Sequence, residues 1–322
     1  MLPVGGWQLC PLEEWPLIGA VPKNYLAYGD PEDPNCVAYI AKKGRQLDGR
    51  LRECVTEEII SKIGSMLPVR IARSKLVRLP VPPGAQPDVR FLSRDFVRRG
   101  QEQLLHGAEI FAQYLGTRQE ELSAVFNLDD KNAEREFYTI SNVVDVLDGF
   151  SRNARERGEL LSGFARMLTF DAFVGAQDRH ALNWGVLQPL TGGGDVRFAP
   201  LFDTARGLFR EHTDSKLRDI EAAGHTEAKI RDYAARSRPV FGAGRRNITN
   251  HFELLDVAIE CFPTELGHTI RTFVRSINVP DIKRMLQRRF RRIVTPIRLD
   301  FIVRLLQHRY LRLLTIVERS EK

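Results

Sequence analysis

Apolar and polar residues follow strand-like patterns through most of the first hundred residues. Residues 37–43 (VAYIAKK) are β-prone and follow the turn-rich segment GDPEDPN, and residues 69–79 (VRIARSKLVRL) alternate polar and apolar side chains over much of their length. Between them, apolar residues recur at helical spacing over 53–67. A Pro-rich connector over 80–88 then leads into another apolar stretch over 89–97. This part of the chain therefore predicts short strands around one helix.

Beyond Gly100 the pattern becomes mostly helical. The predicted helices are 102–115, 134–147, 157–175 and several segments after residue 215. One break interrupts them, because residues 181–203 (ALNWGVLQPLTGGGDVRFAPLFD) hold two short apolar runs separated by a Gly-rich turn. Such a segment predicts a β-hairpin inside a helical region.

The chain is long enough for two lobes that share a cleft, since it has 322 residues. We assign residues 1–97 to a small β-rich N-lobe and residues 98–322 to a larger helical C-lobe with the embedded hairpin. This order predicts an α+β fold with the general plan of kinase-like folds.

Composition excludes several other classes of protein. The chain is 43% hydrophobic and 28% charged, as in ordinary soluble globular proteins. Its four cysteines lie far apart and form no C-x-x-C pair, which argues against a disulfide framework or a zinc knuckle. The N-terminus lacks a basic start followed by an apolar run, and no run of about 18 apolar residues occurs. We therefore expect a cytoplasmic protein with no transmembrane segment.

The net charge of +7 is concentrated at the C-terminus. Residues 281–322 hold 12 Lys and Arg against four Asp and Glu, so the preceding 280 residues carry a net charge of −1. Apolar residues from Leu299 to Leu314 follow helical spacing, which favours an amphipathic final helix packed on the large lobe. Contact with nucleic acid or a ribonucleoprotein is a second interpretation of these arginines, and attachment to a membrane surface is a third.

Residues 177–183 (QDRHALN), which we call the 177–183 loop, are the strongest candidates for chemistry. Asn183 is followed 20 residues later by Asp203. Phosphoryl transfer needs a carboxylate that positions the attacking hydroxyl, and an amide oxygen and second carboxylate that hold magnesium against the phosphates. Asp178, Asn183 and Asp203 offer this set. The structural alternative is that these residues cap turns and helices, where Asp and Asn are common.

The segments around the 177–183 loop and Asp203 resemble motifs of a known family. FVGAQDRHALNWGVL and APLFD resemble the catalytic loop and metal-binding motif of the HipA-like serine/threonine kinases, with matches at Asp178, His180, Asn183 and Asp203. The motif G-x-x-D-R-H-x-x-N also resembles a motif of phosphatidylinositol kinases. The resemblance covers roughly residues 17–210 and implies a two-lobed protein-kinase-like fold that uses ATP and Mg²⁺.

The resemblance extends into the N-lobe. YIAKK is similar to the strand that bears the nucleotide-binding lysine, which implies that role for Lys42 rather than for Lys43. The family's spacing puts the partner glutamate eleven residues before the glycine that ends the helix, and counting back from Gly64 gives Glu53. Glu57 is the second candidate for this partner glutamate. The alternative is that these charges are solvated surface groups.

Two further segments carry implied nucleotide contacts. IGAVPKNYL resembles the family's phosphate-covering loop, with matches at Gly19, Ala20 and Lys23. The sequence before Gly19 lacks the serine whose phosphorylation switches off some family members, and the extra N-terminal subdomain of the full-length toxin is not expected. The segment 91–96, which includes Arg94, would be the hinge whose backbone meets the adenine.

The sequence thus predicts an ATP- and Mg²⁺-dependent phosphotransferase, with a protein Ser or Thr hydroxyl as acceptor. A catalytically silent pseudokinase that binds partners through its basic tail is the alternative from another class, and a lipid or small-molecule kinase is the enzymatic alternative. The implied partners are a protein substrate and an antitoxin-type or ribonucleoprotein partner. The sequence does not identify the acceptor or the oligomeric state.

Overall fold

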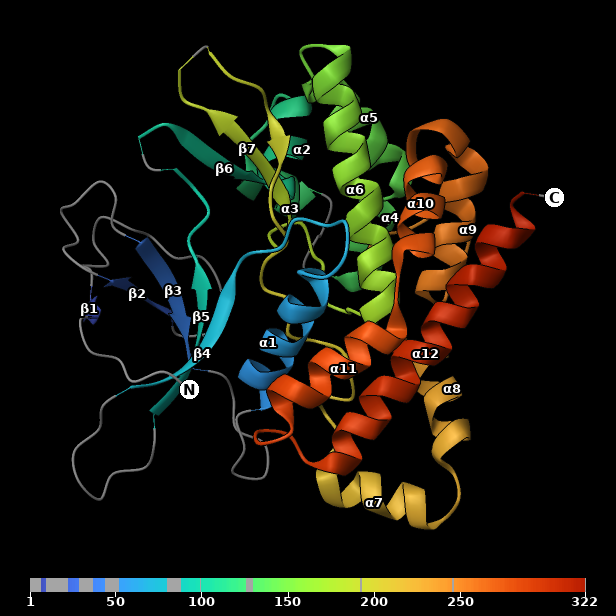
Figure 1. Cartoon of the computed structure of the whole chain (residues 1–322). Helices are drawn as coiled ribbons and strands as arrows, with labels where there is room; N and C mark the ends of the chain where they lie inside the picture. Colours follow the sequence, from blue (N-terminus) through green and yellow to red (C-terminus); the bar gives the residue numbers. More distant parts are fainter. Residues whose placement is uncertain are drawn as a thin grey trace.

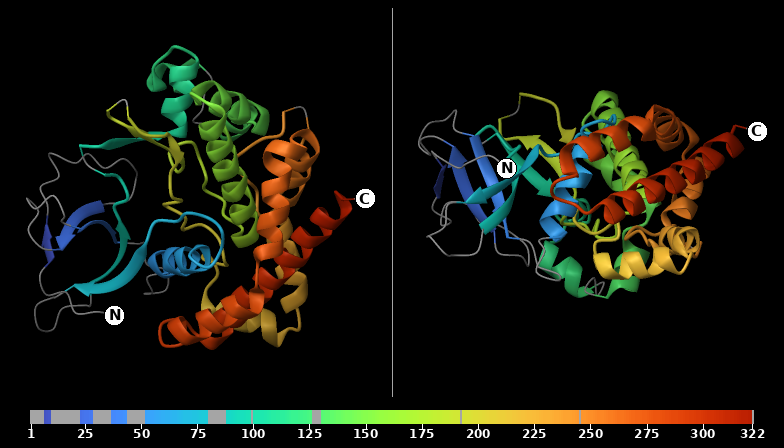
Figure 2. Two further views of the ribbon diagram at one scale, coloured as in Figure 1. Left: turned by 45° about the horizontal axis from the view of Figure 1, so that its top comes forward. Right: turned by 60° about the horizontal axis from the view of Figure 1, so that its bottom comes forward.

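The structure is a computed structural model that describes residues 7–9, 23–28, 37–43, 52–79, 88–98, 100–125, 130–191, 193–244 and 246–321. One antiparallel sheet lies on one side of the molecule and most helices lie on the other (Figure 1). Helix α1 (Arg52–Gly64) lies between the two, as two further views show (Figure 2). The sheet and the helical part therefore meet along α1.

Among the described residues, the larger sheet has five antiparallel strands in the order β1-β2-β3-β5-β4. They are β1 (Trp7–Leu9), β2 (Lys23–Tyr28), β3 (Val37–Lys42), β4 (Ser74–Leu79) and β5 (Asp88–Arg94). Alternate side chains pack on opposite faces: Leu92 lies in a small core with Ala41, whereas Phe91 lies in a second one with Cys54 of α1. The predicted strands at 37–43 and 89–97 and the predicted helix at 53–67 are confirmed within a few residues. The predicted connector at 80–88 lies outside the described residues except for Asp88.

The predicted strand at 69–79 is confirmed only in its second half, β4. Its first half contacts the helical part, because Ile71 forms a parallel bridge with Leu201, two residues before Asp203. The Leu201 amide donates to the Arg70 carbonyl at 2.8 Å, and the Ala72 amide donates to the Leu201 carbonyl at 2.9 Å. The segment after α1 and the segment before Asp203 are therefore held together by backbone hydrogen bonds.

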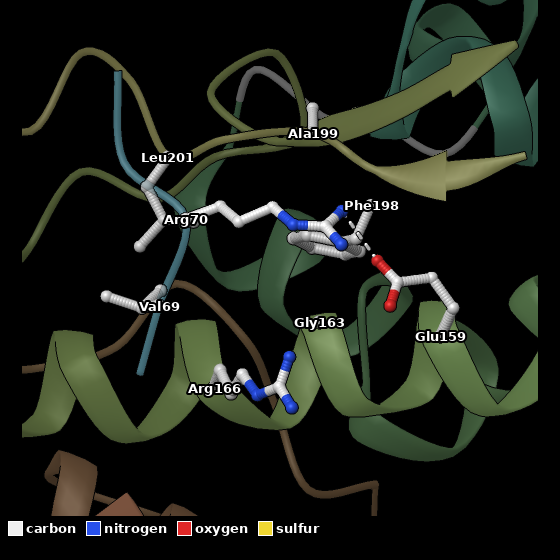
Figure 3. A pocket seen from close by; sticks show the side chains of 8 residues that line it. All are labelled: Val69, Arg70, Glu159, Gly163, Arg166, Phe198, Ala199 and Leu201. Atoms are coloured by element: carbon white, nitrogen blue, oxygen red, sulfur yellow. Dashed lines mark ion pairs between the residues drawn. The ribbon is translucent and has the colours of Figure 1, made fainter. Parts of the chain in front are cut away.

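A crevice of about 20 Å³ borders this junction (Figure 3). Arg70 crosses it and pairs with Glu159 of helix α6, with 2.7 Å between Nη1 and Oε1. A space of this size holds about one water molecule. The crevice is therefore a joint between the two parts of the fold and does not have room for a substrate.

The second sheet contains the predicted hairpin and one further strand. It consists of β6 (Glu102–His106), β7 (Gly185–Pro189) and β8 (Arg197–Phe198), all antiparallel. The helix predicted over 102–115 is wrong in its first half, since residues 102–106 pair with β7 and only α2 (Gly107–Tyr114) is helical. A Cβ atom on Gly107 would lie 2.4 Å from Trp184, so glycine allows the chain to turn from strand to helix beside that indole.

The helical part surrounds α6 (Ala154–Val174), whose last four turns are almost entirely buried. The other helices are α3 (Gln119–Val125), α4 (Lys131–Phe137), α5 (Ile140–Phe150), α7 (Asp214–Ala222), α8 (Thr226–Arg236), α9 (His251–Cys261), the π-helix η2 (Pro263–Gly267), α10 (His268–Ser276), α11 (Val279–Phe290) and α12 (Pro296–Arg319).

The single helix predicted over 134–147 is wrong. Thr139 interrupts it, because its backbone is extended and its hydroxyl accepts the Asn142 amide as the N-cap of α5.

The basic C-terminal segment forms α11 and α12, and the amphipathic final helix predicted from Leu299 to Leu314 is confirmed as part of α12. Leu299, Ile302 and Leu306 of α12 are buried in the main core, and α12 packs on α6 and α8. Within the described part of the chain, no helix combines the length and the apolar character needed to cross a membrane.

Candidate active site

Lys42 at the end of β3 forms two ion pairs. Its Nζ lies 2.8 Å from Glu57 Oε1 and 2.7 Å from Asp203 Oδ1, so it joins the sheet to α1 and to the helical part. Lys42 is 7% exposed. Lys43 is exposed because successive strand residues face opposite sides. The geometry therefore singles out Lys42 of the two lysines.

The two carboxylates dominate the electrostatics of this group. Burial acts against the charged form of Lys42, but the negative charges of Glu57 and Asp203 outweigh it and raise the pKa of the lysine. Burial raises the pKa of the Glu57 carboxyl, and Lys42 opposes that rise. One ammonium thus faces two acidic groups, so a further cation beside Asp203 would be favoured electrostatically.

The glutamate that contacts Lys42 is Glu57, and the prediction of Glu53 is corrected. Glu53 lies one helical turn earlier, and its Oε1 is 3.2 Å from Nη1 of Arg210. Helix α1 begins at Arg52, so Glu53 lies in its first turn, beside the chain that follows Asp203. Counting back eleven residues from Gly64 leads to Glu53, which lies one helical turn before the residue whose side chain contacts Lys42.

The 177–183 loop follows the end of α6, where Gly175 has a left-handed backbone with φ of 71°. Asp178 is more than a third exposed, and its Oδ2 lies 3.2 Å from Nε of Arg206. Asn183 is buried and donates through Nδ2 to the Asp178 carbonyl at 2.7 Å. The amide nitrogen is thus used to shape the loop, which leaves the amide oxygen as the group that can bind a metal.

His180 lies in the same loop and is half-buried. Its Nδ1 accepts the Leu182 amide at 3.3 Å. Burial lowers the pKa of His180, although the carboxylates of Asp178 and Asp203 oppose this effect. The ring is therefore neutral at neutral pH and acts as a hydrogen-bond acceptor within the loop.

Arg179 joins the parts of the site and was not identified from the sequence. It is buried and forms a bidentate pair with Asp171 of α6, with both N–O distances at 2.9 Å. Its Nη1 also donates to the carbonyls of Asn183 at 2.8 Å and Phe202 at 2.9 Å, and its Nη2 donates to Thr204 Oγ1 at 2.8 Å. One guanidinium therefore fixes the 177–183 loop against the residues on either side of Asp203. The sequence feature that could have pointed to it is its position: Arg179 directly follows the candidate base Asp178 and comes eight residues after Asp171 of the predicted helix.

Asp203 has a left-handed backbone, with φ of 53°. This conformation is uncommon outside glycine, although Asp tolerates it better than most residues, and it persists where the surroundings hold it. Phe202 supplies part of that support, since its ring lies 5.6 Å from Phe96 and 5.9 Å from His106, centroid to centroid. The Asp203 carboxylate is thereby held toward Lys42.

The chain beyond Asp203 is tied to the start of α1. Asp214 Oδ1 lies 3.7 Å from Nη1 of Arg52 and 2.7 Å from Nε of Arg298 on α12. Both arginines also donate to the His212 carbonyl. Because α1 bears Glu57, these contacts couple the final helix of the chain to the position of the Lys42 partner.

The last turn of α6 and the start of the 177–183 loop are anchored from α9 and α12. His251 Nε2 lies 2.7 Å from the Ala176 carbonyl, which can only accept, so this nitrogen carries the proton. Arg309 donates through Nε to the Ala172 carbonyl at 2.6 Å. Both side chains are buried, and burial, with Arg309 nearby, lowers the pKa of His251 to about 3.

This histidine should make the stability of the fold pH-dependent. Its pKa is lower in the folded chain than the ordinary value of 6.5, so the unfolded chain binds more protons and stability falls as pH falls from about 6.5 toward 3. Between pH 7 and pH 5 the loss from this group should be about 2 kcal/mol. We expect His251→Gln to show a correspondingly weaker dependence in urea unfolding at the two pH values. Parallel losses in the variant and the wild type would contradict this assignment.

The remaining predicted residues either lie outside the described part of the chain or make no side-chain contact with Lys42 or the 177–183 loop there. Gly19 and Ala20 lie outside the described residues, as does the side chain of Lys23, whose backbone belongs to β2. Arg94 ends β5 with an exposed side chain, and its amide donates to the Arg73 carbonyl at 2.7 Å. Among the described residues, no side-chain contact joins Arg94 to Lys42 or to the 177–183 loop.

The donor set fits magnesium. Asp203 offers a carboxylate that is about a third exposed, and Asn183 offers a side-chain amide oxygen. Arg179 brings the two residues together through the backbone carbonyls of Asn183 and Phe202. Among the described residues, no three His, Cys, Asp or Glu side chains gather as a metal site. A metal held here would therefore need phosphate or water oxygens to complete its coordination, as is usual for Mg²⁺ but not for structural zinc.

The chain is similar to a protein family and to solved structures over most of its length. The HipA-like C-terminal domain family matches residues 15–294, whereas no curated protein gives a significant match. Among solved structures, the proinflammatory kinase CtkA of Helicobacter pylori has a TM-score of 0.71 at 15% identity, over 97% of this chain and 95% of that one. HipA of a toxin–antitoxin system of Shewanella oneidensis MR-1, solved with HipB and operator DNA, has a TM-score of 0.51 at 13% identity, over 99% of this chain and 73% of that one. These likenesses confirm the predicted α+β, two-lobed kinase-like fold, and the family match shows that this chain belongs to the HipA-like C-terminal domain family.

Proposed function

We propose that this protein is an ATP- and Mg²⁺-dependent kinase that phosphorylates a Ser or Thr hydroxyl of a protein. The observation that carries the proposal is Lys42, held between Glu57 and Asp203 beside the 177–183 loop. A lysine fixed by carboxylates at the end of a strand suits the α- and β-phosphates of a nucleotide. Membership of the HipA-like family and the fold shared with CtkA support a kinase.

Each side chain has a distinct part in this proposal. Lys42 would donate to phosphate oxygens, with Glu57 keeping its ammonium in place. Asp203 and Asn183 would hold Mg²⁺, which when bound supplies positive charge against the transferred phosphate. Asp178 would orient the acceptor hydroxyl and accept its proton, and the neutral His180 would help to shape the loop.

The remaining proposed roles are divided between the two lobes. We propose residues 1–97 as the lobe that covers the nucleotide and residues 98–322 as the lobe that carries the 177–183 loop. Gly19, Ala20 and Lys23 would cover the phosphates, and the backbone around Arg94 would meet the adenine. We also propose a cytoplasmic protein with an antitoxin-type partner, since the HipA neighbour was solved with HipB and DNA.

The pseudokinase alternative is disfavoured by the completeness of the set. A pseudokinase usually lacks at least one of the lysine, the glutamate, the base, the amide ligand and the metal carboxylate, and this chain has a candidate for each. A lipid or small-molecule kinase would differ only in the acceptor.

The glutamates of α1 provide a matched test of the nucleotide site. Glu57→Gln removes the charge that holds Lys42, so we expect ATP affinity or the rate of ATP use to fall about tenfold or more, in line with loss of a buried ionic hydrogen bond. Glu53→Gln, one turn away on the same helix, should change either quantity less than about threefold. Isothermal titration with ATP and Mg²⁺, combined with a measurement of ADP formation, compares the two. A greater loss in Glu53→Gln would contradict the assignment.

A further inference from the structure

A cavity of about 600 Å³ opens beside Asp178 and is not used by the nucleotide site proposed above. Its walls come from the 177–183 loop, from α2, α3 and α4, and from the chain that follows α8. The volume lies within the range of binding sites for small ligands and side chains. It is therefore large enough for a short segment of a substrate.

The cavity lies on the acceptor side of the 177–183 loop. Asp178 and His180 line it, whereas Lys42, Asn183 and Asp203 do not. A group bound there can thus approach the candidate base without occupying the place of the phosphates or the metal. Phosphoryl transfer requires this separation, because the hydroxyl must attack in line from the side opposite the leaving group.

The cavity wall carries an excess of positive charge. Lys131 and Arg238 are exposed, and neither has a carboxylate partner among the described residues. Arg135 also lines the wall, and its Nη2 donates to the Pro239 carbonyl at 3.0 Å. Burial and the neighbouring Arg238 lower the pKa of Arg135, which indicates that the two guanidinium groups lie near each other.

The acidic side chains of the wall do not balance these three cations. Asp178 already pairs with Arg206, which does not line the cavity. Burial and the nearby Asp178 carboxylate raise the pKa of Glu134 to about 7, although the positive charges of Lys131 and Arg135 oppose that rise. Glu134 therefore faces these two cations, but at neutral pH it is only partly ionised and offsets only part of their charge. Neutral residues line the rest of the wall, among them Ala108, Leu122 and Leu182. A bound anion would therefore neutralise charge that the protein leaves uncompensated.

We propose that this cavity binds the acceptor, and that the acceptor is a serine or threonine in a peptide segment with carboxylate side chains beside the hydroxyl. This inference rests on the proposed kinase function. Lys131, Arg135 and Arg238 would recognise the carboxylates, for which the planar fork of arginine is well suited, while Asp178 receives the hydroxyl. The uncharged part of the wall would contact the peptide between these groups.

The test uses short peptides with one central serine flanked by glutamates, by alanines or by lysines. Their affinities are measured by fluorescence anisotropy with the full-length protein, Mg²⁺ and a non-hydrolysable ATP analogue, and phosphate transfer is measured with ATP. We expect the wild type to bind the glutamate peptide about tenfold or more tightly than the lysine peptide, which corresponds to one or two desolvated ion pairs. The double variant Lys131→Glu/Arg238→Glu should reverse that order.

The matched control is Arg288→Glu/Arg289→Glu on α11. It changes the net charge by the same amount at exposed arginines that do not line the cavity. It should keep the wild-type preference, and both double variants should keep wild-type ATP affinity within about twofold, since none of the four residues belongs to the proposed nucleotide site.

The inference and the proposed function fail in different ways. Absence of ATP binding by the wild type would remove the function itself. Normal ATP binding with no preference for the glutamate peptide, or with a preference that the Lys131→Glu/Arg238→Glu variant leaves intact, would overturn the acidic-acceptor inference alone. Efficient transfer to small anionic alcohols, with no binding of any peptide, would also overturn it.

Discussion

Arg179→Met should lower the free energy of unfolding by about 3–5 kcal/mol. The substitution removes one partner of a buried ion pair, and Asp171, which is 2% exposed, keeps its carboxylate in the interior without the guanidinium. Burial already raises the pKa of Asp171, and only Arg179 opposes that effect. The carbonyls of Asn183 and Phe202 lose a donor in the same change.

Urea unfolding at neutral pH measures this loss, and two further variants identify its source. Arg179→Lys keeps the charge but not the two-pronged geometry, so we expect a loss intermediate between those of the wild type and Arg179→Met. Adding Asp171→Asn to Arg179→Met removes the unpaired charge and should recover part of the stability. An unfolding midpoint for Arg179→Met equal to that of the wild type would show that the guanidinium does not hold the site together.

The elements that sequence patterns predicted are those whose structure depends on nearby residues. The strand around Lys42 and helix α1 follow from local periodicity, and so does the hairpin between the 177–183 loop and Asp203. Strand β6 was missed because residues 102–106 pair with β7, about eighty residues further along the chain. Periodicity within a short window contains no information about such a partner.

The site could be predicted as a set of residue types but not as a set of contacts. Spacing and resemblance predicted Asp178, Asn183 and Asp203 as members of one site, and their roles stay a proposal. The choice between Glu53 and Glu57 depends on where α1 begins and on which turn faces Lys42, so a count along the sequence was off by one turn. The role of Arg179 depends on Asp171 and Thr204, which approach it only in the folded chain.

Asp178→Asn should lower the rate of phosphate transfer by about 10²-fold or more, while ATP affinity stays within a few-fold of the wild type. The substitution keeps the size and shape of the side chain but removes the charge that would orient the hydroxyl and accept its proton. Asp178 is more than a third exposed, and its ion pair is with a half-exposed Arg206, so the fold should tolerate the change.

Asp203→Asn should behave differently. It removes a proposed metal ligand and one of the two charges that neutralise Lys42, whose Nζ lies 2.7 Å from the carboxylate. Magnesium-dependent ATP affinity and transfer should therefore both fall, whereas ATP affinity without magnesium should change less. A variant that loses transfer but binds MgATP normally would separate Asp203 from the metal.

Incorporation of labelled γ-phosphate from ATP into protein distinguishes a protein kinase from a protein that only binds ATP. The purified wild type and Asp178→Asn are incubated with Mg²⁺ and a host lysate, and again with EDTA in place of the metal. Our expectation for a Ser/Thr kinase is magnesium-dependent labelling of Ser or Thr, in the protein itself or in a lysate protein, that falls about 10²-fold or more in Asp178→Asn. Equal labelling by the wild type and Asp178→Asn, or no transfer by a wild type that binds ATP, would contradict it.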